Sequence, residues 1–174
     1  KNGTKVLFLG AGGSKYTSEE KNKVIEFFNE IKPIGLITRD RETYNLYNNE
    51  VKNSFDGIDC GFFVSKEFSP MRLRIPNYVV STFDKISEPK INLKGRTLIR
   101  SHHTCWRPIP INYINQESTL ISDLPEDYLN LYANADEVHS DRVHACVAAL
   151  AYGRPARFYN ITPRASLFKS LEID

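Results

Sequence analysis

The stretch from Ala135 to Pro155 reads ADEVHSDRVHACVAALAYGRP, and it determines which fold the rest of the chain can adopt. Glu137 to His139 has the composition of a short strand. Apolar residues three and four positions apart then predict a helix with one buried face, formed by Val143, Cys146, Val147, Leu150 and Ala151. Gly153 and Pro155 are expected to end that helix. The stretch therefore predicts a strand, a tight turn and a buried helix.

The turn between this strand and this helix is suited to an anion. Ser140 or Asp141 could accept hydrogen bonds from the first amides of the helix, where Arg142 and His144 would lie in the first turn. Unpaired amides and the positive end of the helix dipole attract negative charge there. Because Arg142 opposes the dipole unless an anion is bound, the pattern predicts a phosphate or carboxylate site.

His144 lies two positions after Arg142, and side chains at that spacing do not share a helix face. The two side chains can therefore meet on one ligand only above the end of the helix. The alternative is that His144 is a neutral, hydrogen-bonded histidine without a ligand.

Composition limits the class of protein. The chain has 174 residues, of which 41% are hydrophobic, enough for a packed core. Its net charge of +2 comes from 23 basic and 21 acidic residues, so no nucleic-acid partner is expected. The three cysteines lack CxxC spacing, which favours a reducing compartment. No apolar run is long enough for a transmembrane segment. Because the chain runs directly from Lys1 into a predicted strand, we expect it to be part of a longer protein.

The remaining segments alternate between strand-like and helix-like patterns, which predicts an α/β fold with parallel sheets. The expected strands are Lys5–Leu9, Ile34–Thr38, Ile58–Val64, Tyr78–Phe83, Thr97–Arg100, Ser118–Ile121 and Ala156–Tyr159. The expected helices follow a capping box at Thr17 and Glu20, the segment Arg39–Thr43, and Pro125, with a last helix at Pro163–Leu171. The aperiodic segment Ser65–Asn77 is expected to be a linker. In the glycine turn after the first strand, Lys15 replaces the third glycine of a dinucleotide fingerprint, so a simple tight turn is the better interpretation.

Three blocks in order resemble the polysaccharide pyruvyl transferase family. They are ITRDRETYNLY, IDCGFFV, and the long run LPEDYLNLYANADEVHSDRVHACVAALAYGRPARFYNITPRASLFKSL. This resemblance implies a GT-B-like architecture, with two Rossmann-like lobes and an active site in the cleft between them. The lobes would be residues 1–76, on the acceptor side, and residues 77–174, on the donor side. The family's amino-terminal strand with an Asn-x-Gly-Asp turn is absent, so the first lobe is expected to be incomplete.

The resemblance also implies an activity: transfer of pyruvyl from phosphoenolpyruvate to a sugar hydroxyl, forming a ketal. Phosphoenolpyruvate is then a substrate, and neither cofactor nor metal is required. The acceptor would be a polysaccharide or glycan of the cell envelope, either free or lipid-linked. The protein would be cytoplasmic, or peripheral to the inner face of the membrane.

Donor residues follow from the anion chemistry, because arginine binds carboxylate and phosphate bidentately. Arg142 and His144 are the expected catalytic residues. His144 would bind the phosphate and protonate it as it leaves. Ser140, Arg39 and Arg164 complete the expected donor set. Arg39 ends a predicted strand on its carboxyl side, although an ion pair with Asp40 or Glu42 is equally compatible with the pattern.

Asp59 begins the block IDCGFFV, but capping a turn is its favoured role. Arg164 is expected to repeat the geometry of Arg142 at the start of the last helix.

The segment 101–107, SHHTCWR, is expected to contact the acceptor. An aromatic face and a guanidinium suit a saccharide, so Trp106 and Arg107 join His102 and His103 as acceptor-binding residues. A packed loop is the structural alternative. A zinc site would require a second pair of ligands, which the sequence lacks. One of the two histidines is also a candidate general acid.

Two other functions remain open at this point. The same helix end could hold the diphosphate of a nucleotide sugar in a GT-B-type glycosyltransferase. The chain could also be a non-catalytic saccharide-binding module.

Overall fold

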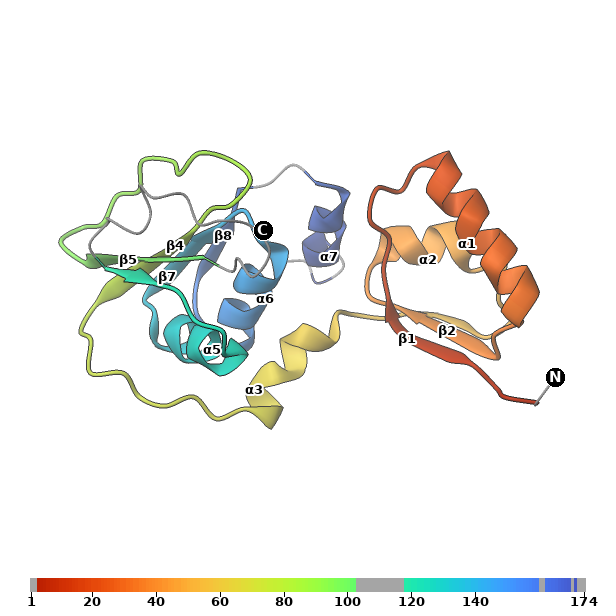
Figure 1. Ribbon diagram of the computed structural model, residues 1–174, viewed down its shortest axis with the longest axis horizontal. Helices are drawn as coiled ribbons and strands as arrows, with labels where there is room; N and C mark the ends of the chain where they lie inside the picture. The colour runs from red at the N-terminus through yellow and green to blue at the C-terminus, as the bar shows by residue number, and fades with distance from the viewer. Residues whose placement is uncertain (1–2, 103–117, 160–161, 170, 172–174) are drawn as a thin grey trace. The chain divides into compact units, whose positions relative to one another are not determined.

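The computed structural model describes residues 3–102, 118–159, 162–169 and 171. The chain forms two compact units, one made of residues 1–60 together with 161–174, and the other made of residues 61–160 (Figure 1). We call them unit 1 and unit 2. Both contain a parallel sheet, which confirms the predicted α/β class. The division differs from the expected lobes, because residues 61–76 fall in unit 2 and the carboxyl-terminal segment falls in unit 1.

Unit 1 is built around a three-stranded parallel sheet in the order β1-β2-β3. Its elements are β1 (Leu7–Ala11), α1 (Ser18–Ile31), β2 (Gly35–Thr38), α2 (Arg41–Tyr47) and β3 (Ser54–Asp56). Helices α1 and α2 lie on one face of the sheet (Figure 1). Their buried side chains meet those of β2 in a small core formed by Phe28, Leu36, Tyr47 and Val51. The last elements of the chain, η2 (Pro163–Ala165) and α7 (Ser166–Lys169), also belong to this unit.

The capping box predicted before α1 is present in modified form. The side chain of Thr17 accepts a hydrogen bond from the amide of Glu20 at 3.2 Å, as the motif requires. The Glu20 carboxylate does not return a bond to Thr17. It accepts instead from the amides of Ser14, Lys15 and Tyr16, and these bonds, led by the one from Ser14, lower the pKa of Glu20 although burial opposes them. Glu20 thereby fixes the loop that follows β1.

The strand predicted at Ile58–Val64 is wrong. The third strand of unit 1 is Ser54–Asp56, and the apolar residues that follow form η1 (Cys60–Phe63) and then α3 (Val64–Glu67). At Gly57 the chain passes so close to β2 that an added Cβ would lie 2.5 Å from the carbonyl oxygen of Thr38. Pairing ends there, and a short apolar run that cannot pair forms a helical turn, which sequence periodicity does not distinguish from a strand.

Unit 2 contains a five-stranded parallel sheet in the order β6-β5-β4-β7-β8. The strands are β4 (Tyr78–Thr82), β5 (Thr97–Ser101), β6 (Thr119–Leu120), β7 (Glu137–Ser140) and β8 (Ala156–Phe158). Helix α5 (Pro125–Asn134) connects β6 to β7, and α6 (Val143–Ala151) connects β7 to β8. If the five strands of this sheet are numbered along the chain, their spatial order is 3-2-1-4-5, which is the arrangement of a Rossmann-type sheet. The predicted Rossmann-like character is confirmed for unit 2.

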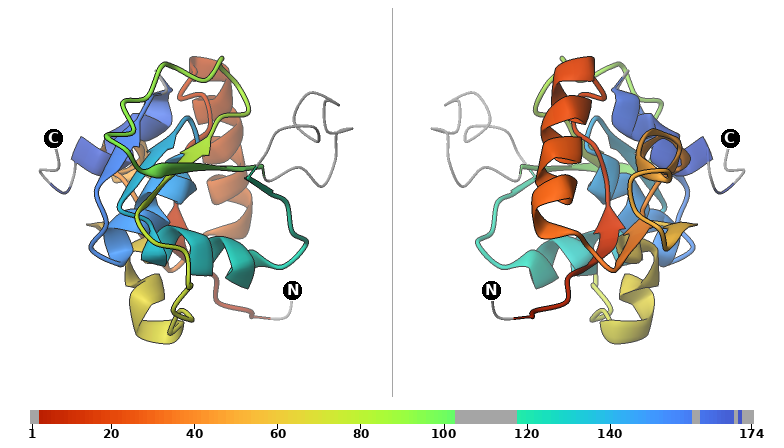
Figure 2. Two further views of the ribbon diagram at one scale, coloured as in Figure 1. Left: turned by 90° about the vertical axis from the view of Figure 1, so that its left-hand side faces the viewer. Right: turned by 90° about the vertical axis from the view of Figure 1, so that its right-hand side faces the viewer.

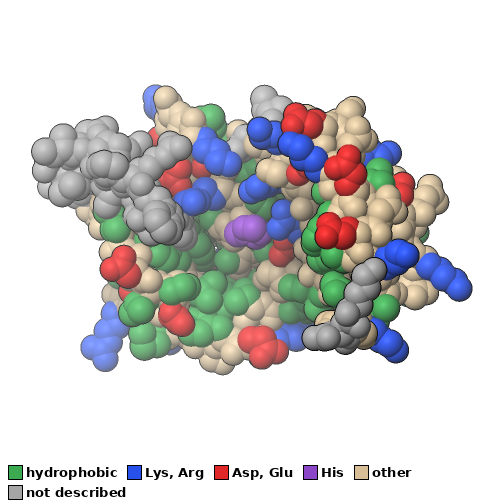
Figure 3. Space-filling model, turned by 45° about the vertical axis from the view of Figure 1, so that its right-hand side comes forward, with side chains coloured by type: hydrophobic (Ala, Val, Ile, Leu, Met, Phe, Trp, Pro, Cys, Tyr) green, Lys and Arg blue, Asp and Glu red, His purple; other side chains and the backbone are tan. Residues whose placement is uncertain are grey.

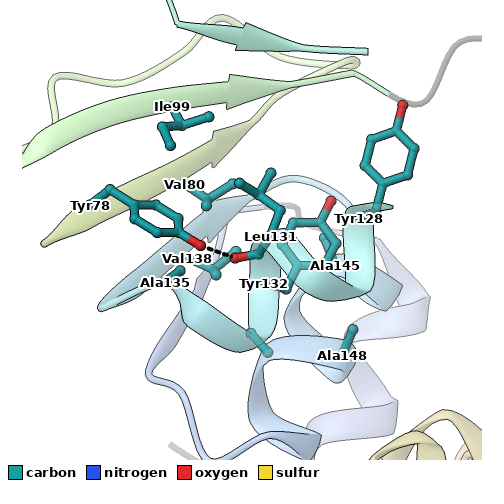
Figure 4. Packing of buried hydrophobic residues seen from close by; sticks show 11 residues of the cluster. Tyr78, Val80, Ile99, Tyr128, Leu131, Tyr132, Ala135, Val138, Ala145 and Ala148 are labelled. Carbon is teal, nitrogen blue, oxygen red and sulfur yellow. Dashed lines mark hydrogen bonds between the residues drawn. The ribbon is translucent and has the colours of Figure 1, made fainter. Parts of the chain in front are cut away.

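The core of unit 2 lies between this sheet and helices α5 and α6 (Figure 4). Tyr78 of β4 is fully buried, and its hydroxyl donates to the carbonyl of Leu131 at 2.6 Å. Burial raises the pKa of Tyr78 to about 12, so the phenol stays neutral. The alternation of β4 and β7 directs Val80 and Val138 into this core. Of the apolar face predicted for α6, Cys146 and Val147 are buried, while Val143, Leu150 and Ala151 are only partly buried. Ala145, Ala148 and Ala149 are the other buried residues of this helix, which ends at Ala151, two residues before Gly153 with its φ of +69°.

The opposite face of the sheet in unit 2 carries several polar side chains beside the fully buried Val79. Residues between β4 and β5 lie on this side, away from α5 (Figures 1 and 2). Glu88, from that segment, accepts a hydrogen bond from Ser81 of β4 and forms a two-bond ion pair with Arg100 of β5. On β7, His139 is buried between the Tyr159 hydroxyl at 2.7 Å and Glu137 at 3.0 Å. The faces of this sheet therefore differ in chemistry.

The segment Ser65–Asn77, expected to be a linker, packs on α5. The amide of Met71 donates to the side chain of Asn130, and the amide of Leu73 donates to the side chain of Asn134. Both asparagines belong to α5. Asn134 also donates to the carbonyl of Met71 at 2.8 Å. An aperiodic sequence does not reveal such bonds, because they depend on asparagines about 60 residues away.

Candidate donor site at the carboxyl ends of the strands of unit 2

The site predicted around Arg142 lies at the carboxyl end of the sheet in unit 2. Strand β4 has β5 on one side and β7 on the other, so the connections from this point leave in opposite directions. Open α/β sheets bind ligands at such a switch point, outside the carboxyl ends of the strands. The residues that follow β4, β5 and β7 directly therefore come together there.

Asp84 is the central residue of this group. One carboxylate oxygen lies 3.2 Å from Nδ1 of His102, which follows β5. The other accepts a hydrogen bond from the Arg142 guanidinium at 2.5 Å. Asp84 was not among the site residues predicted from the sequence. The rule that singled out Arg39, a polar residue after a predicted strand, applies equally to Asp84 and would have found it.

Asp141, one of the two residues that the sequence offered as a cap for α6, bonds the turn after β4. Its carboxylate accepts from the amides of Asp84, Lys85 and Ile86, at distances from 2.6 to 3.2 Å. The side chain is almost completely buried, with 1% exposed. A buried carboxylate that accepts hydrogen bonds from successive amides holds the turn after β4 in place. Asp141 thus fixes the backbone from which the Asp84 side chain projects.

Arg142 is the N-cap residue of α6, and its side chain makes no capping hydrogen bond. The sequence predicted that an arginine here requires an external anion. The structure supplies that anion internally, because Asp84 neutralises the guanidinium. The dipole argument alone therefore does not establish a ligand. The Arg142 side chain is still 34% exposed, so it remains accessible at the end of the helix.

Ser140 and His144 differ in accessibility. Ser140 is fully buried, donates to the carbonyl of Thr82 at 2.9 Å and accepts from the amide of Arg142 at 2.8 Å. Its hydroxyl thus anchors the backbone at the helix start, next to β4. His144, the second residue of α6, is exposed at the surface. Its predicted donor role stays a prediction.

His102 is buried, with 4% exposed, and both its side chain and its backbone are fixed. Its carbonyl accepts from the Tyr128 hydroxyl at 2.6 Å, and its amide donates to Leu120 of β6. Beside it, the hydroxyls of Thr82 and Ser101 lie 2.5 Å apart. The other acceptor residues expected from the sequence, His103, Trp106 and Arg107, lie outside the described residues, as does Cys105.

The remaining predicted donor residues lie in unit 1. Arg39 follows β2, as expected, and its guanidinium is 3.6 Å from the carboxylate of Asp59. The ion-pair partner of Arg39 is therefore Asp59, and not Asp40 or Glu42 as the sequence also allowed. Asp40 instead caps α2 by accepting from the amide of Thr43. Asp59 accordingly has an ion-pairing role in addition to any role in the turn. The Arg39 side chain lies against Gly12, where any Cβ would overlap its Nε.

Arg164 does not repeat the geometry of Arg142. It lies in the short 3-10 turn η2, and its guanidinium donates to the hydroxyl of Ser14 at 3.3 Å. The helix that follows has only four residues, too few to build a dipole comparable to that of α6. Whether Arg164 contacts a donor stays a prediction.

Charges of both signs are interspersed on the face of the molecule in Figure 3. Within the described residues, no group of three or more His, Cys, Asp or Glu side chains is arranged to hold a metal ion. In the same part of the chain, no helix combines the length and apolarity needed to cross a bilayer. The two cysteines described are unpaired thiols, Cys60 exposed and Cys146 buried.

Comparison with known proteins supports the interpretation of the three sequence blocks. A solved structure, UDP-N-acetylglucosamine 2-epimerase from Rickettsia bellii, resembles the chain with a TM-score of 0.48 at 15% identity. That match covers 92% of this chain and 52% of the epimerase chain, so this chain spans about half the length of that protein. No curated protein matches the sequence. A model of the family described as polysaccharide pyruvyl transferase matches residues 1–162, and the chain therefore belongs to this family of transferases.

Proposed function

We propose that this protein transfers a pyruvyl group from phosphoenolpyruvate to a sugar hydroxyl, forming a ketal. The observation that carries the proposal is the position of Arg142: an accessible guanidinium at the amino end of α6, at the switch point of a Rossmann-type sheet. Phosphoenolpyruvate carries a carboxylate and a phosphate, the groups that a guanidinium binds best. Family membership provides the independent support for pyruvyl transfer to a polysaccharide.

Arg142 and His144 have complementary roles in this proposal. Arg142 binds an anionic group of the donor through the exposed part of its guanidinium, since the side chain is 34% exposed although it also bonds Asp84. His144, in the first turn of α6, binds the phosphate and supplies a proton as it leaves. Ser140 supports the site by accepting from the amide of Arg142. Arg39 and Arg164 remain expected donor contacts.

The reaction balances without a cofactor. A proton adds to the methylene carbon of phosphoenolpyruvate, and a sugar hydroxyl adds to the adjacent carbon. A second hydroxyl of the same saccharide then displaces phosphate and closes the ketal. Of the two hydroxyl protons, one ends on the new methyl group and the other leaves with inorganic phosphate.

The saccharide acceptor, free or lipid-linked, and a cytoplasmic or peripheral location are part of the proposal. The acceptor would contact the segment that includes His102, with His103, Trp106 and Arg107. Each of these assignments can be tested once turnover is measured with a defined glycan.

Phosphorus NMR of the full-length protein with phosphoenolpyruvate and candidate glycans tests the function. We expect inorganic phosphate to appear together with a new methyl resonance in the glycan. Arg142→Ala should lower kcat/KM for the donor about 10²-fold, because two charge-assisted hydrogen bonds contribute about 3 kcal/mol. Arg157→Ala, at an exposed position on β8, is the matched control. Absence of phosphate release with every glycan, or equal activity of the two variants, would refute the proposal.

A further inference from the structure

The segment between α3 and β4 combines exposed apolar and exposed basic side chains. Met71 and Ile75 are 66% and 44% exposed, and the two arginines between them, Arg72 and Arg74, are exposed as well. Leu73, between the arginines, turns inward and packs against the core of unit 2. We call residues 71–75 the strap. Single exposed apolar side chains are common on protein surfaces, but here two of them flank two guanidiniums within five residues.

The backbone of the strap is held against α5. The amide of Met71 donates to Asn130 at 2.8 Å, and Asn134 accepts from the amide of Leu73 and donates to the carbonyl of Met71. Figures 1 and 2 show this part of the chain along one edge of unit 2. The backbone that presents the exposed side chains is therefore ordered before any partner binds, which lowers the entropic cost of binding.

Helix α3, which precedes the strap, adds a second combination of the same kind. Lys66 lies over the ring of Phe63, 5.4 Å from its centroid, and both side chains are exposed. The hydroxyl of Tyr152, the residue that follows α6, donates to the carbonyl of Phe68 at 3.0 Å and so holds the end of α3. Helix α3 and the strap therefore both present apolar side chains next to cations.

The charge of this region is positive, whereas the rest of the chain is balanced. Residues 63–77 contain three basic side chains and one acidic side chain, Glu67, while the remainder of the sequence has 20 of each sign. The net charge of +2 is therefore that of this region. A partner that suits it has to be anionic and has to offer an apolar phase to methionine and isoleucine side chains. The surface of an anionic bilayer offers both, whereas nucleic acid offers mainly the charge.

We propose that residues 63–75 bind the surface of an anionic lipid bilayer. The basic side chains contact the headgroups, while Phe63, Met71 and Ile75 enter the boundary between the headgroups and the acyl chains. Attachment of this kind is reversible, because it depends on a few side chains of each type. The inference does not rest on the donor chemistry. It deepens the proposed function by assigning a surface that would hold the protein where a lipid-linked saccharide is presented.

Sedimentation of the full-length protein with vesicles tests this proposal. We expect binding to phosphatidylcholine vesicles that contain about one third phosphatidylglycerol, and little binding to pure phosphatidylcholine. Binding should weaken as NaCl rises to about 0.5 M, because salt screens the headgroup charge. The double variant Arg72→Gln/Arg74→Gln should lose at least about tenfold in affinity, since each cation near anionic headgroups contributes about fivefold. Met71→Ser/Ile75→Ser should lose at least about fivefold.

Two exposed residues elsewhere provide matched controls, Arg157→Gln on β8 and Leu9→Ser on β1, where Leu9 is 68% exposed. Neither control should change the affinity by more than about twofold. Equal binding to the two kinds of vesicle, unchanged binding in either double variant, or an equal loss in the controls would overturn the inference. Tighter binding to double-stranded DNA than to the anionic vesicles would also overturn it, because it would indicate a nucleic-acid partner.

The outcome of this assay is separate from that of the proposed function, because no phosphoenolpyruvate is present. Failure to bind the vesicles would overturn the membrane surface and leave pyruvyl transfer intact. A protein that binds them as expected but releases no phosphate from phosphoenolpyruvate would refute only the proposed function.

Discussion

Replacing Asp141 with alanine should destabilise unit 2 and loosen the turn after β4. The carboxylate accepts from three successive amides, those of Asp84, Lys85 and Ile86, and it is 1% exposed. Each hydrogen bond to a charged group contributes about 1.5–3 kcal/mol. Part of that sum is offset, because removing a buried charge recovers several kcal/mol of desolvation and water can reach a turn that is only partly buried. We therefore expect a loss of about 2–4 kcal/mol in the free energy of unfolding.

Asparagine at the same position keeps one acceptor oxygen, so Asp141→Asn should lose about half as much stability. Urea unfolding followed by circular dichroism measures both values. Hydrogen–deuterium exchange gives the local readout: the amides of residues 84–86 should lose protection in both variants. Asp123→Ala, which removes an exposed carboxylate of unit 2, should stay within about 0.5 kcal/mol of wild type.

The functional consequence follows from the same bonds. Without Asp141 the Asp84 carboxylate is no longer held beneath Arg142, so donor affinity should fall together with protection of the turn. An Asp141→Ala protein whose stability is within about 0.5 kcal/mol of wild type, with amides 84–86 still protected, would refute the role of this carboxylate.

Three more predictions follow from the buried residues of unit 2. Burial lowers the pKa of His139, with Arg157 and Arg96 acting in the same direction and Glu137 opposing, while Tyr159 contacts the ring. The unfolded chain thus takes up this proton near pH 6.5 and the native protein does so only at lower pH, so the free energy of unfolding should fall as pH drops below about 6.5. Urea titrations at pH 7.5 and 5.5 should show a smaller fall in His139→Gln, and an equal fall would contradict the assignment. Burial raises the pKa of the Cys146 thiol to about 12, so iodoacetamide at neutral pH should label exposed Cys60 and spare Cys146, as site-resolved mass spectrometry can determine. Leu131→Ala should cost about 2–5 kcal/mol in urea unfolding, because the side chain is 3% exposed in the core; Leu124→Ala, 59% exposed on the same segment, serves as its control.

Local patterns predicted most of the elements correctly. The helix α6, its stop before Gly153 and the strand that begins at Glu137 all appear where the sequence indicated them, although the buried face of α6 is centred on Ala145–Ala149 and not on the residues that the spacing predicted. These features depend on residues a few positions apart, so periodicity and turn chemistry are sufficient to find them. The strand of unit 1 was misplaced by a few residues because a short apolar run fits a strand and a helical turn equally well.

The candidate site was only partly predictable. Arg142 and its place at a helix start follow from the sequence, and so does a polar residue at the end of β2. The contacts that give Arg142 its environment do not, because Asp84 lies 58 residues earlier in the chain. The sequence offered Ser140 or Asp141 as a cap for α6, but it did not indicate that the Asp141 carboxylate bonds a turn 55 to 57 residues away.

The sequence by itself determined the α/β class, the family, and the helix start at which Arg142 stands. Each is encoded by neighbouring residues whose spacing reflects the helix and strand repeat. Only the tertiary structure decided which strands are adjacent, and hence that the turn after β4, the end of β5 and the start of α6 meet. The physical reason is that parallel strands pair through crossovers of many residues, so side chains distant in sequence share one edge of the sheet. Asp84 contacts both His102 and Arg142 only because the sheet brings these three residues together at that edge.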